Sequence, residues 1–197
     1  MARTREFDEN VVLERARDLF WEQGYTATSI QDLEKALGIS RSSIYASFGS
    51  KRALYDKTLA AYQHENMGRL QKLLRDTKGL RETLVTLFTD TAMQSHPNCK
   101  SSARGCYMVN ATTEMANACS ETLKFVADNR EQFVGIMADA LASAQVQGKL
   151  EEQSDPVELA NFLFVSYIGM EVVVQTNIDR KVLVKAVRRS VDFLPWL

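Results

Sequence analysis

The sequence predicts an all-α protein, and three observations support that fold class. Apolar residues recur at helical spacing through almost all of the 197 residues. Only three prolines and nine glycines interrupt the chain, which favours long helices over a many-stranded β fold. No uninterrupted run of about 18 apolar residues is present, so we expect no membrane span. The fold should therefore be a bundle of helices that buries its apolar faces internally.

The first 49 residues predict three short helices. A first helix begins after Asp8, a candidate N-cap, and ends at Gly24, which suits a left-handed position. Thr28 is expected to cap a second helix over 29–37, with Gln31 completing a capping box. A tight turn over 38–40 then leads into a third helix over 41–47.

The remaining residues predict longer helices. Ser50 is a candidate cap for a helix over 50–76, followed by helices over 79–95, 105–117 and 120–147. Asp155-Pro156 is a strong start signal for a helix that reaches about residue 176, and a last helix covers 179–194. The polar segment 96–103 is expected to be a loop. We find no internal repeat, so the chain reads as a small N-terminal unit joined by a long helix to a C-terminal helical bundle.

Two short capped helices joined by a turn that contains glycine are typical of a helix-turn-helix. Its second helix must enter the major groove of DNA, which requires small or polar residues on the outer face. That demand is met here by Arg41, Ser42, Ser43, Ala46 and Ser47, while Ile44 and Phe48 face inward. Tyr45, Lys51 and Arg52 are candidate phosphate contacts, and Arg3 and Arg5 form a basic arm. The net charge of −1 argues weakly against DNA binding, so the prediction rests on where charges lie locally.

The same stretch resembles the N-terminal signature of TetR-family regulators between about residues 11 and 59. The resemblance rests on the run 24–30, on the segments 38–41, 43–45 and 50–54, and on Leu33, Ala36 and Phe48. It implies a homodimer that binds double-stranded operator DNA through residues 1–49 and is released by a small-molecule inducer bound within residues 50–197. It also implies that Thr28, Tyr45 and Lys51 contact phosphates, and that the groove is read by Arg41, Ser42, Ser43 and Ser47. Ser42, where the family often has glycine, and the pair Ala46-Ser47 depart from the family pattern and bear on which operator is read.

The middle helices carry flexible methionines and aromatic residues that suit a pocket for an apolar or aromatic ligand. Ordinary core packing is the competing interpretation. The candidate ligand-binding residues are Phe88, Met93, Tyr107, Met108, Phe125, Phe133, Met137, Phe164, Tyr167 and Met170.

The last two helices are the expected dimer face, because two such helices and their copies form a four-helix bundle. Gly169 would allow close approach of the helices, although a core helix is the alternative. The candidates for this face are Leu159, Phe162, Val165, Ile168, Gly169, Val172, Val182, Val187 and Val191.

Cys106 follows Arg104-Gly105 and resembles a cysteine at the start of the sixth helix in one branch of TetR-like regulators, which includes sensors of electrophiles and reactive chlorine. A helix N-terminus and a nearby arginine both lower a thiol pKa, so Cys106 is a candidate redox input. The alternative is a small buried apolar residue. Cys99 and Cys119 are possible resolving partners.

The odd number of cysteines favours free thiols in a reducing cytoplasm, and the N-terminus lacks the apolar stretch of a secretory signal. His96, Cys99 and Cys106 also suggest a metal site, but two histidines and no CxxC make that the weaker interpretation, and no metal or cofactor is expected. There is no glycine-rich phosphate loop, nucleophile elbow or evident triad, so we do not expect an enzyme. A helical dimer that does not bind DNA remains the third hypothesis, and activation remains an alternative to repression.

Overall fold

The computed structural model describes residues 7–75, 79–93, 104–115 and 119–197. Within these ranges the chain forms nine α-helices, and its only extended pairing is an isolated bridge between Leu150 and Trp196. The predicted all-α class is therefore confirmed. The expectations for Arg3, Arg5, His96 and Cys99, and for the loop over 96–103, lie outside the described residues.

The N-terminal helices are α1 (Glu9–Gln23), α2 (Ile30–Leu37), α3 (Arg41–Phe48) and the long α4 (Lys51–Leu74). Asp8 caps α1 as predicted, because its carboxylate accepts from the backbone N–H of Asn10. The cap of α2 is Ser29 and not Thr28, and its capping box closes on Asp32 and not on Gln31. The prediction was one residue early, since Ser29 and Asp32 have the same spacing as the pair that we expected.

The C-terminal helices are α5 (Leu80–Met93), α6 (Tyr107–Met115), α7 (Ser120–Val146), α8 (Pro156–Val173) and α9 (Arg180–Asp192). The start signal at Asp155-Pro156 is confirmed, since the Asp155 carboxylate accepts from Val157 N–H and proline occupies the first turn. Asp179 caps α9 in the same way, through Lys181 N–H. All nine helices lie within a few residues of their predicted bounds.

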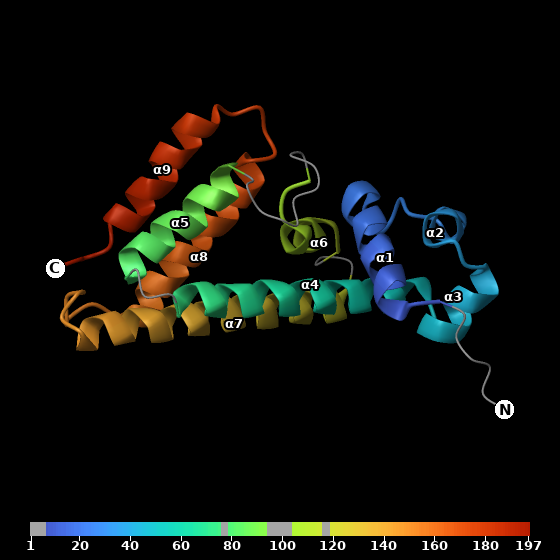
Figure 1. Cartoon of the computed structure of the whole chain (residues 1–197), viewed down its shortest axis with the longest axis horizontal. Coiled ribbons are helices and arrows are strands. Elements are labelled where there is room, and N and C mark those ends of the chain that lie inside the picture. Colours follow the sequence, from blue (N-terminus) through green and yellow to red (C-terminus); the bar gives the residue numbers. More distant parts are fainter. Residues whose placement is uncertain (1–6, 76–78, 94–103, 116–118) are drawn as a thin grey trace.

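α4 and α7 run side by side along the length of the molecule, as Figure 1 shows. The three short helices α1–α3 gather at one end of this pair, and α5, α8 and α9 pack at the other end. α6 lies between the two groups and packs against α4, α7 and α8. The 24-residue α4 spans about 36 Å, so it connects both groups as one rigid element.

The buried apolar residues fall into two clusters. One joins α5, α7, α8 and α9 to the C-terminal half of α4, with Phe88, Met137 and Leu141 at its centre. The other joins α1–α3 to the N-terminal half of α4 and also takes in residues 106–115, most of them in α6. α6 therefore shares a core with the helix-turn-helix, although some 60 residues of chain separate them.

Candidate functional site

The turn between α2 and α3 holds the two helices in a fixed orientation. Gly38 ends α2 in the left-handed region at φ 70°, where a side chain would be strained. Ser40 caps α3, with its hydroxyl accepting from Ser43 N–H at 3.2 Å. The Glu34 carboxylate reaches across from α2 and accepts from Arg41 N–H at 2.6 Å. Both helices are therefore locked locally, as a helix that enters a DNA groove requires.

The outer face of α3 consists of small and polar side chains. Ile44 and Phe48 are buried under it, which confirms their predicted inward orientation. Arg41, Ser42 and Ala46 are exposed, whereas Ser43 and Ser47 are half-buried. This face borders a groove of about 780 Å³ between α3 and the start of α1, whose other lining residues include Phe7, Val11, Arg15 and Ile39. Three of the residues predicted to read the major groove of DNA, Ser42, Ser43 and Ser47, line this groove on the protein surface.

The candidate phosphate contacts differ in how they are presented. The Lys51 ammonium lies 4.3 Å from the centre of the Tyr25 ring, and partial burial lowers the pKa of Lys51. Tyr45 is half-buried beneath the Arg41 guanidinium, 5.4 Å from its ring centre. Thr28 is buried, and its hydroxyl donates to Gly24 O at 2.6 Å. In this structure its side chain therefore serves the turn between α1 and α2.

Arg52 does not project with Lys51 toward the outer face of the helix-turn-helix. Its guanidinium donates to Asp56 one turn along α4, at 2.8 Å. It also donates to Cys119 Sγ, at the N-cap of α7, at 2.7 Å, and to Thr122 Oγ1 in the first turn of α7, at 2.8 Å. This placement corrects the expectation of a phosphate contact, because all the bonds named here are made inside the protein. Arg52 instead fastens the start of α4 to the start of α7.

A partly open cavity of about 210 Å³ lies among α4, α5, α6, α7 and α8. Its wall is mostly apolar, with a smaller set of polar groups that includes Asn66, Arg69, Asp90 and Asn129. Four of the predicted ligand-binding residues line it, namely Met108, Phe133, Phe164 and Tyr167. A cavity of this kind suits a small, largely apolar molecule that makes a few directed hydrogen bonds.

The other candidate ligand residues do not line that cavity. Phe88, Met137 and Met170 are buried in the C-terminal cluster, and Phe125 packs against the N-terminal one. Tyr107 is buried, with its hydroxyl 2.9 Å from the Thr58 hydroxyl, and Met93 is exposed at the end of α5. For the buried residues the competing interpretation as core packing fits better, since helical spacing alone does not separate a core face from a cavity wall.

Cys106 lines the cavity, but its thiol is not activated as the sequence suggested. Burial, reinforced by the nearby Glu171 carboxylate, raises the pKa of the Cys106 thiol to about 12. Arg104 points away toward α1, where it pairs with Glu22 at 3.2 Å. The expected lowering of the pKa is therefore wrong, because the arginine that was to stabilise a thiolate is engaged elsewhere. The Tyr62 hydroxyl instead donates to the thiol at 3.5 Å.

Glu171 is a buried carboxyl behind this wall that the sequence did not single out. Burial raises its pKa from the ordinary 4.5 to about 7, opposed by a hydrogen bond from the Tyr167 hydroxyl and by the Arg69 charge. Between about pH 4.5 and pH 7 the folded protein therefore binds more protons at this site than the unfolded chain does. Consequently the contribution of Glu171 to the free energy of unfolding falls as pH rises through this window.

Glu171→Gln is expected to remove that fall, because glutamine is uncharged and keeps a hydrogen-bond acceptor for Tyr167. Relative to wild type, the variant should gain stability at pH 8 on the order of 2 kcal/mol. The measurement is urea unfolding at pH 5 and pH 8, at one fixed protein concentration. If the free energy of unfolding changed by the same amount between pH 5 and pH 8 in the variant and in wild type, Glu171 would not titrate in this way.

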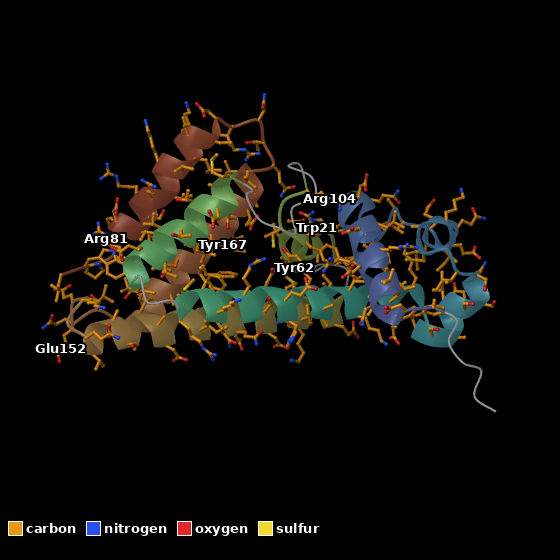
Figure 2. The ribbon with its side chains drawn as sticks, viewed as in Figure 1. Trp21, Tyr62, Arg81, Arg104, Glu152 and Tyr167 are labelled. Carbon is orange, nitrogen blue, oxygen red and sulfur yellow. The ribbon has the colours of Figure 1, made fainter. Side chains whose placement is uncertain are left out.

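α6 and the residues before it are bonded to α1 as well as to the cavity. Figure 2 shows Arg104 beside Trp21, and the Trp21 indole N–H donates to Arg104 O at 3.1 Å. The Arg104 guanidinium also lies 3.7 Å from Asp18. Since Cys106 and Met108 line the cavity two and four residues later, this segment connects the cavity wall to the helix-turn-helix.

α8 and α9 leave an apolar surface uncovered. Four exposed residues of α8 recur every three or four positions, namely Phe162, Val165, Gly169 and Val172, and Val165 is 69% exposed. This apolar face comprises Phe162, Val165, Gly169, Val172, Val182 and Phe193, with the rings of Phe162 and Phe193 5.9 Å apart. Of the other predicted dimer residues, Leu159 and Ile168 are half-buried, and Val187 and Val191 are buried within the protomer. The prediction was wrong for Val187 and Val191, because they lie on the side of α9 that joins the protomer's own core.

Among the described residues, α8 is the one helix that is long and apolar enough for a membrane span, with a mean hydropathy of 1.3. A single helix of this kind is weak evidence for a membrane, since core helices meet the same test. Here α8 packs against α5, α6, α7 and α9 and carries the buried Glu171. Its high hydropathy is explained by one side that is packed inside the protomer and another that forms the apolar face.

Comparisons with known proteins agree with this arrangement. Residues 12–58 match the family model of bacterial regulatory proteins, tetR family. The chain is 27% identical to the transcriptional repressor ComR of Escherichia coli (strain K12) over 86% of this chain and 80% of ComR. It is 30% identical to the structure of a putative TetR transcriptional regulator from Rhodococcus sp. RHA1, with a TM-score of 0.62, over 96% of this chain and 100% of that one.

A third similar protein is a cysteine-substituted form of the TetR family regulator CifR, solved in complex with a 26-base-pair double-stranded operator DNA. It is 27% identical to this chain, with a TM-score of 0.85, and the match covers 98% of this chain and 100% of that one. The capped helix-turn-helix, the arrangement of the nine described helices and these similarities together lead to one conclusion. The chain belongs to the TetR family of bacterial regulatory proteins, and it is a helix-turn-helix transcriptional regulator rather than an enzyme.

Proposed function

We propose that this protein is a cytoplasmic repressor that binds operator DNA as a homodimer. The observation that carries the proposal is the exposed outer face of α3, held by the Ser40 cap and flanked by Lys51 at the start of α4. A helix of this size fits the major groove, and a lysine at a helix N-terminus suits an adjacent phosphate. Two proteins that are similar to this chain over most of their length support the same function. CifR was solved in complex with operator DNA, and ComR is a transcriptional repressor.

The apolar face of α8 and α9 supports the dimer. Two copies that bury these faces against each other would form an isologous four-helix interface at the end opposite the helix-turn-helix. The two α3 helices must then lie about 34 Å apart to reach successive major grooves.

The cavity supports release by a small, largely apolar inducer. An inducer acts by binding more tightly to the form in which the two α3 helices are wrongly spaced, and a near-complete switch needs a difference of about 5 kcal/mol. α4 and α6 both line the cavity and both pack in the core of the helix-turn-helix, so they are the elements that would transmit the change.

The function is tested by selecting duplexes from a random pool with the purified protein and measuring their affinity by fluorescence anisotropy at several salt concentrations. Enrichment of a two-fold symmetric sequence is the expected result. Failure to enrich any sequence would contradict operator binding and favour a helical dimer that does not bind DNA.

Lys51→Ala is expected to weaken binding to all duplexes by a similar factor and to lower the slope of log affinity against log salt by about one. The reason is that a lysine at a phosphate releases about one counterion and reads no base. Tyr45→Phe should weaken binding uniformly as well, through loss of a phenol hydroxyl. The same anisotropy titration measures both variants.

Lys124→Ala is the control for Lys51→Ala, because Lys124 is an exposed lysine of α7 that pairs with Asp128. It should leave affinity and salt slope unchanged. An unchanged slope for Lys51→Ala would remove Lys51 from the set of phosphate contacts.

A further inference from the structure

The loop between α1 and α2 is held by a side chain from α6. Glu114 Oε2 accepts from Tyr25 N–H at 2.9 Å, and Glu114 Oε1 accepts from Thr26 N–H at 2.7 Å. Gly24 makes this approach possible, since its φ is 84° and an added Cβ would lie 3.0 Å from Glu114 Oε2. Two charge-assisted hydrogen bonds therefore join the helix-turn-helix to the ligand-binding part of the chain.

The loop that Glu114 holds also positions the groups expected at the DNA backbone. Tyr25 supports the Lys51 ammonium, which lies 4.3 Å from its ring centre. Thr28, three residues further on, closes the loop through its bond to Gly24 O. The Glu114 charge also acts directly on Lys51. The ring of Tyr25 thus positions the Lys51 side chain, and the backbone N–H of the same tyrosine is bonded to Glu114 of α6.

Two effects of Glu114 on DNA binding oppose each other. Its negative charge near Lys51 disfavours an incoming phosphate, but charges near the surface are screened by salt over about 8–10 Å. Its two hydrogen bonds fix the backbone beneath Tyr25, and a hydrogen bond to a charged group contributes a factor of about ten or more to an equilibrium. The positioning effect should therefore exceed the repulsion.

We propose that Glu114 is a positioning residue for DNA binding, which holds the 24–28 loop so that Tyr25 presents Lys51 to a phosphate. This inference rests on the proposed function. It also gives the cavity a short route to the DNA interface, since Met108, two turns before Glu114 on α6, lines the cavity. Movement of α6 would be felt at Lys51 without any change in the fold of α2 and α3.

The test is operator affinity and its salt dependence for Glu114→Ala, Glu114→Gln, Lys51→Ala and the double variant, on a duplex selected with the wild-type protein. Glu114→Ala should weaken binding about tenfold, although it removes a negative charge, and should lower the salt slope as Lys51→Ala does. Glu114→Gln, which keeps the size and one acceptor, should lie between. The double variant should bind no more weakly than the weaker single variant, because both changes remove the same contact between a correctly placed Lys51 and a phosphate.

Glu131→Ala removes an exposed carboxylate from α7 and serves as the charge control, with no expected effect. Unchanged or tighter binding by Glu114→Ala, with Lys51→Ala weakened, would overturn the positioning role and leave the proposed function intact. Additive losses in the double variant would overturn it as well. If Lys51→Ala bound the operator as wild type does, Lys51 would not be a phosphate contact, and this inference would fall with it. Thermal unfolding of each variant checks that it is folded. If Glu114→Ala is not folded, the isosteric Glu114→Gln variant is used for the test in its place.

Discussion

Val165→Glu is expected to convert the dimer to a monomer and to weaken operator binding by about a hundredfold or more. Val165 is 69% exposed in the protomer, at the middle of the apolar face. A dimer that uses this face would bury an unpaired carboxylate from each copy, which is strongly unfavourable. Linking two DNA-binding modules raises affinity by about 10²–10⁴ over one module alone, and a monomer loses that gain. Sedimentation should show a fall to the monomer mass of 22.2 kDa.

Leu123→Glu provides the matched control for this change. Leu123 is a 54% exposed apolar residue of α7, outside the apolar face of α8 and α9. The variant should remain dimeric and bind the operator as wild type does. A dimeric Val165→Glu protein with normal affinity would place the dimer interface elsewhere on the molecule.

Phe88→Ala should lower the free energy of unfolding by about 3–5 kcal/mol. Phe88 is fully buried, and its ring packs edge-on against Tyr167 with centroids 5.8 Å apart. Removing the ring loses its burial and leaves a space that the surrounding helices cannot fill. Denaturant unfolding at one fixed protein concentration measures the loss, since the stability of a dimer depends on concentration.

Phe164→Ala is the informative comparison, because Phe164 lines the existing cavity and is only half-buried. Its truncation should cost less stability and should enlarge the space available to a ligand. If Phe88→Ala were as stable as wild type, Phe88 would not be the core residue that its burial indicates, and its sequence interpretation as a ligand contact would regain support.

The helices could be predicted because their signals are local. Asp8, Ser40, Ser50, Asp155 and Asp179 each cap a helix through a neighbouring backbone N–H. Such a bond depends on residues two or three positions away, so the sequence contains all the information that it needs. The helix-turn-helix was predictable for the same reason, since its caps, turn and inward apolar residues lie within about 30 residues.

The environment of Cys106 could not be predicted in this way. The pKa of the Cys106 thiol depends on Glu171, 65 positions away, and on which acidic side chain Arg104 pairs with. Proximity in the sequence suggested that Arg104 would stabilise a thiolate, but α1 offers Asp18 and Glu22 to the same guanidinium. A shifted pKa follows from burial and from every charge nearby, and neither is a property of the local sequence.

By itself, then, the sequence determined the all-α class, the bounds of the helices to within a few residues and the outward face of α3, because these follow from short-range caps and from helical periodicity. Only the tertiary structure decided which apolar faces line the cavity, which form the core and which stay uncovered on α8 and α9. It alone brought Glu114 to the loop before α2, some 90 residues earlier in the chain. The reason is that periodicity marks a face as apolar without saying what that face packs against, and long-range partners are chosen by how whole helices pack.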